Sequence, residues 1–325
     1  MAFLRNDSGT RIPPFDGEAF PWIGGDAQTL RHFLRNDAPN APAGETIILD
    51  LEDGDQLMAA YHHPTAPLNG CVIAVHGLNG CMDAAHILWL TPAMLSAGYA
   101  VLRVNMRGAG PARSLAKKTY NAGAGADLLP FIRWATGRHP DQPVFMMAHS
   151  LGGTAALNMA LDFPDAARQL AGLITICAPL DMVATAAQFH AMRNWPYIRY
   201  MLGGLKNIAA TVPALDPALA ATAKTVKSVY EFDDKLTAPL AGYADAMAYY
   251  RGTSVHQRLG DLPLPSLILQ SSNDPWIPAG PALAQPQLGH QRDIVVTKGG
   301  GHVGFHDTQR NWHIRASIAW MNSTA

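Results

Sequence analysis

The chain has 325 residues, of which 48% are apolar and 15% charged, and its formal net charge is −1. This composition is typical of a soluble globular protein with one large domain or two smaller ones. A near-neutral charge of low density argues against a nucleic-acid-binding surface, so no nucleic-acid partner is expected.

Cysteine content and hydropathy indicate the compartment. Three cysteines are too few for a disulfide framework, and Cys71 and Cys177 lie in apolar runs where inert, buried thiols are expected. The N-terminal stretch has no apolar core of signal-peptide length, and no segment approaches the ~18 consecutive apolar residues of a membrane helix. We therefore expect no integral membrane segment and a cytoplasmic location.

The first quarter of the chain predicts a loose beginning followed by a hairpin. Residues 1–45 are rich in Pro, Gly, Asn and Asp, and we expect an irregular lead-in that wraps the core, with one short amphipathic piece at 27–34. Residues 46–51 and 56–61 alternate apolar and polar side chains around an Asp-Gly pair, which is a hairpin signal. The sheet is therefore expected to begin antiparallel.

From residue 70 onward, apolar strands alternate with helices. The expected strands are 71–75, 100–104, 144–147, 172–177, 266–270 and 293–297, and the expected helices are 84–97, 122–136, 154–163 and 306–321. Such alternation implies parallel pairing, right-handed crossovers and helices on both faces. The sequence predicts an α/β fold with a mostly parallel central sheet, whose core is formed by residues 46–180 and 261–325.

Residues 181–260 interrupt this alternation. They contain four helical pieces, at 182–192, 196–208, 217–229 and 243–250, without a buried strand between them. An all-helical insertion of this kind is expected to form a cap over the carboxyl edge of the sheet. Because ligand sites are mostly apolar clefts, the large cap side chains Trp195 and Met201 are candidates for lining a substrate pocket.

One stretch in the middle of the chain predicts a nucleophile. The apolar strand Val144–Met147 breaks at Ala148 and restarts as a helix, with Ser150 at the turn. The pattern nearly matches G-x-S-x-G, with Ala148 at the first glycine position, and such a turn lifts the serine hydroxyl off the sheet and aims the first helix amides at its target. His149, beside the serine, is a further candidate for the substrate pocket. Taken alone, the motif also fits an ordinary strand-to-helix turn.

Three polar residues at strand ends strengthen that prediction. They occur in the chain order Ser150, Asp274, His302, and in a parallel sheet such positions meet at one edge. A serine hydroxyl is a poor nucleophile until a histidine takes its proton, and the histidine needs an anion to orient and stabilise it. The three together predict a catalytic triad, although singly Asp274 also fits a turn cap and His302 a loop histidine.

An acyl-transfer site also needs donors for the oxyanion. The backbone amide of Leu151, directly after the serine, is one candidate. Leu78, on the loop after strand 71–75, is the other, and His76 is expected to brace that loop.

Three rival constellations are weaker. His302 and His306 have helical metal-ligand spacing but no accompanying acidic zinc-protease motif, so no metal is expected. Arg107–Gly110 could cradle a phosphate, but it lacks the third glycine, and a tight loop is the simpler interpretation. Asp233 and Asp234 could bind a cation, although a cap or a solvated turn is the more usual role of such a pair.

Several motifs together resemble a known family. They are His76-Gly-Leu-Asn-Gly80, Asn105-Met-Arg-Gly108, His149-Ser-Leu-Gly-Gly153, Glu231-Phe-Asp-Asp-Lys-Leu-Thr-Ala-Pro-Leu240 with Tyr249-Tyr250, Ser272-Asn-Asp-Pro275 and Gly300-Gly-His-Val-Gly-Phe305. The sequence resembles the α/β-hydrolase superfamily and, more narrowly, the YheT-like (embryogenesis-associated type) hydrolases, to which the block at 231–240 is the most specific. The resemblance implies a Ser150–Asp274–His302 triad and carboxylester hydrolysis without a cofactor.

The expected function is a serine-dependent hydrolase of carboxylic esters that forms an acyl-enzyme and acts on a small-molecule ester with an apolar acyl chain. Transfer of the acyl group to an alcohol, or hydrolysis of a thioester, would use the same triad. A non-catalytic binding protein that has kept the fold is the alternative from another class.

Overall fold

A computed structural model describes residues 3–5, 12–65, 67–212, 215–286, 288 and 291–324. These residues form a nine-stranded sheet in the order β1-β9-β8-β7-β6-β4-β5-β3-β2. The strands are β1 (Phe3–Arg5), β2 (Glu45–Asp50), β3 (Gln56–His62), β4 (Gly70–Val75), β5 (Tyr99–Asn105), β6 (Val144–His149), β7 (Gly172–Ile176), β8 (Ser266–Ser271) and β9 (Arg292–Thr297).

The central strands are parallel and the outer ones antiparallel. Pairing is parallel from β5 through β4, β6, β7 and β8 to β9, whereas β2–β3, β3–β5 and β1–β9 are antiparallel. The hairpin at the start of the sheet and the mostly parallel core are thus confirmed. All six residues of β4, β6 and β8 are buried, which explains their near-continuous apolar sequences.

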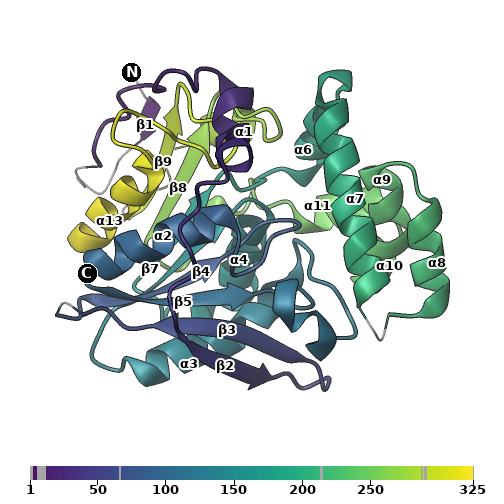
Figure 1. The fold of residues 1–325 in the computed structure, drawn as a ribbon, viewed down its shortest axis with the longest axis horizontal. Helices are drawn as coiled ribbons and strands as arrows, with labels where there is room; N and C mark the ends of the chain where they lie inside the picture. The colour runs from purple at the N-terminus through teal and green to yellow at the C-terminus, as the bar shows by residue number, and fades with distance from the viewer. Residues whose placement is uncertain are drawn as a thin grey trace.

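Helices cover both faces of this sheet (Figure 1). The core helices are α1 (Gly25–Arg35), α2 (Ala85–Ser96), α3 (Leu129–Arg138), α4 (Leu151–Asp162), α5 (Pro164–Ala167), α12 (Gly280–Leu283) and α13 (Trp312–Thr324), with 3₁₀ turns at Gly110–Leu115, Ala124–Leu128 and Leu259–Asp261. One apolar cluster joins the sheet to α2 and α13, and the other joins it to α3 and α4. Along β6 the side chains alternate between them: Phe145 and Met147 belong to the α2/α13 face, and Met146 and Ala148 to the other.

The beginning of the chain is more ordered than its composition predicts. Residues 3–5 pair with β9 at the edge of the sheet, and the amphipathic piece expected at 27–34 is helix α1. Residues 1, 2 and 6–11 of the expected lead-in lie outside the described residues. The short strand β1 depends on its pairing with β9 rather than on local propensity, which is why composition did not indicate it.

The insertion after β7 is helical, as expected, and has a core of its own. Its elements are α6 (Met182–Phe189), a 3₁₀ turn (Met192–Asn194), α7 (Trp195–Thr211), α8 (Pro217–Thr225), α9 (Val229–Phe232), the π-helical turn η4 (Asp233–Thr237), α10 (Ala238–Leu240) and α11 (Ala246–Thr253). A separate apolar cluster packs α7 against α8, α9 and η4. Figure 1 shows α7–α10 beside the sheet, as a cap at one end of the molecule.

The last helix begins later than predicted. Residues 306–311 form no helix, and α13 starts at Trp312. Arg310 and Asn311 have positive φ angles of 62° and 48°, a left-handed conformation that a right-handed helix cannot contain. Among the described residues, no helix combines the length and the apolarity that crossing a membrane would require.

Candidate active site

Ser150 lies at a sharp turn between β6 and α4. Its φ of 51° and ψ of −129° are strained for a residue with a side chain. A Cβ on Gly152 would lie 2.1 Å from the His76 carbonyl oxygen, so only glycine fits there. Ala148, by contrast, lies in the extended strand and is fully buried, so the position where the motif usually has glycine accommodates a methyl group.

The three residues predicted as a triad lie together at the carboxyl edge of the sheet. Nε2 of His302 is 2.9 Å from Oγ of Ser150, and Nδ1 of His302 is 2.8 Å from Oδ2 of Asp274. Ser150 follows β6, Asp274 follows β8 and His302 follows β9. The hydrogen bonds form a continuous chain from the hydroxyl to the carboxylate, with both imidazole nitrogens engaged.

Asp274 has a second set of contacts. Its other oxygen, Oδ1, accepts the backbone N–H groups of Trp276 at 2.8 Å and Ile277 at 3.0 Å. The turn-capping role and the histidine-orienting role are therefore performed by different oxygens of one carboxylate. The Trp276 ring also packs on His302, with 4.4 Å between ring centroids, and restricts the imidazole.

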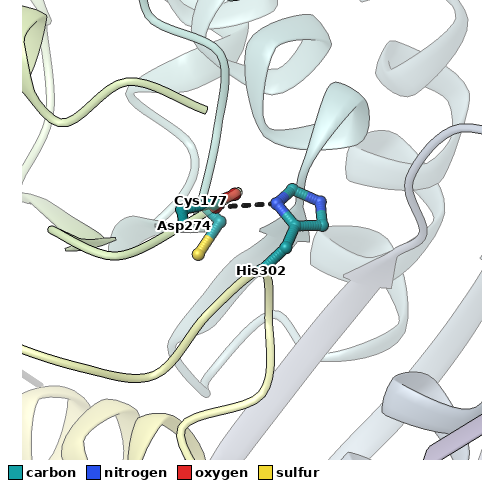
Figure 2. A group of neighbouring side chains, drawn as sticks. All are labelled: Cys177, Asp274 and His302. Atoms are coloured by element: carbon teal, nitrogen blue, oxygen red, sulfur yellow. Dashed lines mark hydrogen bonds and ion pairs between the residues drawn. The ribbon is translucent and has the colours of Figure 1, made fainter. Parts of the chain in front are cut away.

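Cys177 lies behind this carboxylate. Figure 2 shows its sulfur beside Asp274, on the opposite side from the bond to His302. Burial, followed by the charge of Asp274, raises the thiol pKa well above its usual value, which agrees with the inert thiol predicted from the sequence. Among the described residues these three are the one group of potential metal ligands with all ligand atoms within 4.8 Å. Because the thiol is held protonated and the other two are bonded to each other, we interpret the group as a hydrogen-bonded triad.

Helix α1 supports the histidine loop. The hydroxyl of Thr29 accepts the backbone N–H of His302 at 2.8 Å. A Cβ on Gly301 would lie 2.4 Å from the Gly25 carbonyl oxygen, so the loop and the helix are in close backbone contact. The N-terminal segment therefore contributes to the position of His302.

The loop after β4 abuts the serine. A Cβ on Gly77 would lie 2.8 Å from Cβ of Ser150. The Gly77 carbonyl accepts the Tyr120 hydroxyl at 3.0 Å and is 2.8 Å from Nδ1 of His76. In a trans peptide the N–H of Leu78 points opposite to the Gly77 carbonyl. By holding that carbonyl, Tyr120 and His76 therefore determine the direction of the Leu78 amide. His76 is buried and braces this loop, as expected.

A mostly apolar cavity opens beside Ser150. It encloses about 950 Å³, its open mouth included. Its lining includes Leu78, Ser150 and Leu151 from the core, and from the cap Met182, Phe189, His190, Met201, Leu205, Ile208, Phe232, Asp233, Thr237, Tyr249 and Tyr250. The cavity thus joins the serine to the underside of the cap, and Met201 lies where the sequence placed it.

Two predicted pocket residues lie elsewhere. His149 is fully buried on the α2/α13 face, its ring centroid 4.7 Å from that of His86, because alternation along β6 turns it away from the cavity. Trp195 is the first residue of α7, is 60% exposed, and stacks with Arg199 outside the cavity. Both predictions were wrong: alternation along β6 places His149 on the face away from the cavity, and Trp195 is exposed outside it.

The rival constellations have other roles. Arg107 is bonded to the carboxylates of Asp53, Asp55 and Asp127, so its guanidinium is occupied by acids and does not form a phosphate cradle. His306 lies in the loop before α13, so the helical spacing from His302 that suggested a metal pair does not occur.

Asp233 and Asp234, adjacent in the cap, have different environments. Asp234 accepts the first backbone N–H of α11, from Ala246, at 3.0 Å, whereas Asp233 lines the cavity. Sequence reasoning did not assign Asp233, Tyr249 or Tyr250 to the site. The signal available was the family-specific block at 231–240, which contains this aspartate.

Comparisons with known proteins agree with this geometry. A family model described as the alpha/beta hydrolase fold matches residues 70–308, more than half of the chain. The YheT protein of Escherichia coli strain K12, provisionally named an esterase, is 29% identical over 264 residues, which cover 79% of this chain and 77% of that protein.

Two eukaryotic relatives are more distant. Medium-chain fatty acid ethyl ester synthase/esterase 2 of Saccharomyces cerevisiae is 26% identical over 274 residues, covering 75% of this chain and 60% of its own length. Human phospholipase ABHD3 is 26% identical over 303 residues, covering 87% of this chain and 71% of that protein. Among solved structures, a soluble variant of S. cerevisiae monoglyceride lipase has a TM-score of 0.59 at 15% identity, covering 88% of this chain and 97% of the other, and this likeness shows the fold alone.

Proposed function

Because the chain belongs to the α/β-hydrolase family, and to its esterase- and lipase-type members, we propose that it is a serine-dependent hydrolase of carboxylic esters that works through an acyl-enzyme. The observation that carries the proposal is the hydrogen-bond chain from Ser150 through His302 to Asp274, at 2.9 and 2.8 Å, with Ser150 on the lining of a mostly apolar cavity. An esterase needs both an activated hydroxyl and a site that accommodates the acyl group.

In the first half-reaction, Oγ of Ser150 attacks the ester carbonyl while Nε2 of His302 takes the hydroxyl proton. Asp274 stabilises the imidazolium through Nδ1. The tetrahedral intermediate collapses, the C–O bond to the alcohol breaks, and His302 returns the proton to the leaving alkoxide. In the second half, His302 deprotonates a water that attacks the acyl-enzyme, and the carboxylic acid leaves as Ser150 regains its proton.

The backbone amides of Leu78 and Leu151 are the hydrogen-bond donors that stabilise the negative charge on the carbonyl oxygen in this mechanism. The Leu151 amide is the first of α4, and first-turn amides have no partner within their helix. Both residues line the cavity next to Ser150. Removing one such donor typically lowers kcat by about 10²–10³-fold in related chemistry, so this pair supplies a large share of the catalysis.

The apolar walls favour a neutral acyl chain of several carbons over acetate. The yeast relative's name includes both synthase and esterase, so transfer of the acyl group to an alcohol is the second candidate. In that reaction an alcohol, instead of water, attacks the acyl-enzyme. A cytoplasmic location stays a prediction from the sequence.

Labelling with a fluorophosphonate tests the proposal. An activated serine beside an oxyanion hole reacts with such probes, whereas an unactivated surface serine does not. We expect stoichiometric labelling, mapped by peptide mass analysis to Ser150 and abolished in Ser150→Ala. The exposed Ser272→Ala is the matched control and should label normally. A well-folded wild-type protein that does not label would favour the non-catalytic binding protein instead.

A further inference from the structure

The cavity contains a carboxyl group that the hydrolysis mechanism does not use. Asp233 lines the same space as Ser150, although most of the lining is apolar. The Tyr250 hydroxyl donates to its Oδ2 at 2.6 Å. Burial raises the pKa of Asp233 to about 6, although Tyr250, Thr237 and the charge of His190 act to lower it.

Among the described residues, no lysine or arginine lines the cavity or forms an ion pair with Asp233. His190 also lines the cavity, but Nδ1 of its ring donates to the Ala186 carbonyl at 2.8 Å, and Nε2 accepts the Tyr230 amide at 3.2 Å. Both ring nitrogens of His190 are therefore occupied by backbone groups, and the ring forms no ion pair with Asp233 among the described residues.

The backbone at Asp233 is unusual as well. Residues Asp233–Thr237 form a π-helical turn between α9 and α10. A π turn contains one more residue than an α turn, changes the direction of the side chains that follow, and is frequent at functional sites. Here the turn places both Asp233 and Thr237 on the cavity lining, while Asp234 faces α11.

From these contacts we infer that Asp233 accepts a hydrogen bond from a hydroxyl group on the substrate. The preferred ester would then carry a hydrogen-bond donor as well as an apolar chain. This inference rests on the proposed esterase function and specifies its substrate class. The Tyr250 hydroxyl occupies one acceptor position of the carboxyl group, and the substrate hydroxyl donates to an acceptor position that remains.

The apolar walls decide between a hydroxyl and an ammonium group. An unpaired hydroxyl in an apolar site is unfavourable, but one good hydrogen bond offsets that cost. An ammonium ion has a much larger desolvation cost, which a single carboxylate offsets only with ideal geometry and further hydrogen bonds. The cavity therefore suits a neutral donor, carried either by the alcohol or by the acyl chain of the ester.

Paired esters of one acyl length test the inference. The alcohol arm compares propyl hexanoate with monohexanoylglycerol, and the acyl arm compares p-nitrophenyl hexanoate with its ω-hydroxyhexanoate counterpart. Hexanoylcholine is the cationic probe. In at least one arm the wild-type kcat/KM should be about tenfold higher for the hydroxylated ester, and the arm that responds identifies which half of the substrate reaches Asp233.

The isosteric Asp233→Asn replaces one acceptor oxygen by an NH2 donor, while Tyr250 can still bond the oxygen that remains, and it should abolish that preference. Asp234→Asn, the adjacent aspartate outside the cavity, is the matched control and should keep the preference. Equal wild-type rates within both pairs, a preference that survives Asp233→Asn, or hexanoylcholine as the best substrate would overturn the inference. If folded wild-type protein turns over none of the esters, the esterase proposal itself fails.

Discussion

The side-chain amide of Gln28 forms two hydrogen bonds with the main chain of His306, one as acceptor and one as donor. Its Oε1 accepts the His306 N–H at 2.7 Å, and its Nε2 donates to the His306 carbonyl at 3.0 Å. The same Nε2 also donates to the carbonyl of Trp22 at 2.7 Å, and the side chain is fully buried. Together with Thr29, which accepts the amide of His302, Gln28 links helix α1 to both ends of the histidine loop.

Gln28→Ala should therefore loosen the site as well as the fold. Three buried hydrogen bonds contribute about 1 kcal/mol each, so we expect the free energy of unfolding to fall by about 2–4 kcal/mol in urea titrations. We also expect kcat to fall by about tenfold with little change in KM. The substitution would loosen the position of the base, His302, but would leave the shape of the pocket unchanged. Gln56→Ala, on the exposed hairpin, is the control; a folded Gln28→Ala with wild-type kcat would contradict the role.

Substitutions in the triad should act as a unit. Ser150→Ala and His302→Ala are each expected to lower kcat by about 10⁴–10⁶-fold, and the double variant should be little worse. Asp274→Asn should lower kcat by about 10⁴-fold, because an amide at that position stabilises the wrong imidazole tautomer. Steady-state kinetics on a p-nitrophenyl ester measure all four, and additive losses in the double variant would show that the residues work independently.

Tyr120→Phe tests the support of the oxyanion loop. The hydroxyl holds the Gly77 carbonyl, whose peptide carries the Leu78 amide. Without it we expect kcat to fall by about tenfold while KM changes little, since the amide matters most once the oxyanion forms. Tyr99→Phe removes a hydroxyl that bonds Asn322 and is the matched control. A rise in KM at constant kcat would assign Tyr120 to substrate binding instead.

The dependence of kcat/KM on acyl chain length should reflect contacts with the cap. Each buried methylene contributes about 0.8 kcal/mol, or roughly fourfold in kcat/KM, so rates with p-nitrophenyl esters should rise from acetate to butyrate or hexanoate. Met201→Ala, on the cavity lining, should flatten this rise, whereas Trp195→Ala, outside the cavity, should leave it unchanged. Rates that fall steadily from acetate onward would show a small or polar pocket.

Buried histidines should make the fold sensitive to acid. Desolvation lowers the pKa of His149 to about 4, against a hydrogen bond to Val75 that raises it, and nearby histidines add to the lowering. Desolvation, followed by neighbouring histidines and arginines, lowers the pKa of His306 to about 2 and places that of His313 well below its usual value. The unfolded chain takes up these protons from about pH 6.5 downward while the folded chain does not. The stability is thus fully present above pH 6.5 and is lost as the pH falls from there toward the folded-state values.

Each such histidine should lower the free energy of unfolding by about 1.4 kcal/mol per pH unit below pH 6.5. Urea titrations between pH 7 and pH 5 measure the slope. His313→Phe, which would pack on Phe305, should reduce it by about one proton, and the exposed His63→Phe should leave it unchanged. A slope that is the same in both variants would mean that His313 takes up its proton in the folded state.

The fold class and the chain order of the candidate triad could be predicted from the sequence alone. Apolar runs such as 71–75 and 144–147 alternate with helical stretches, a pattern typical of a parallel sheet, and the carboxyl ends of parallel strands meet at one edge. Ser150, Asp274 and His302 could therefore be predicted before any distance was known. The cap was also predictable, because residues 181–260 contain helical pieces but no strand.

Which side chains face the cavity, and what supports them, followed only from the packing of the chain. In a strand, neighbouring side chains point to opposite faces, so the position of His149 next to Ser150 did not place it in the cavity. The π-helical turn that places Asp233 in the cavity has no local sequence signature. The bond of Gln28 to His306 joins residues 278 positions apart, and contacts at that separation arise only when the chain has packed.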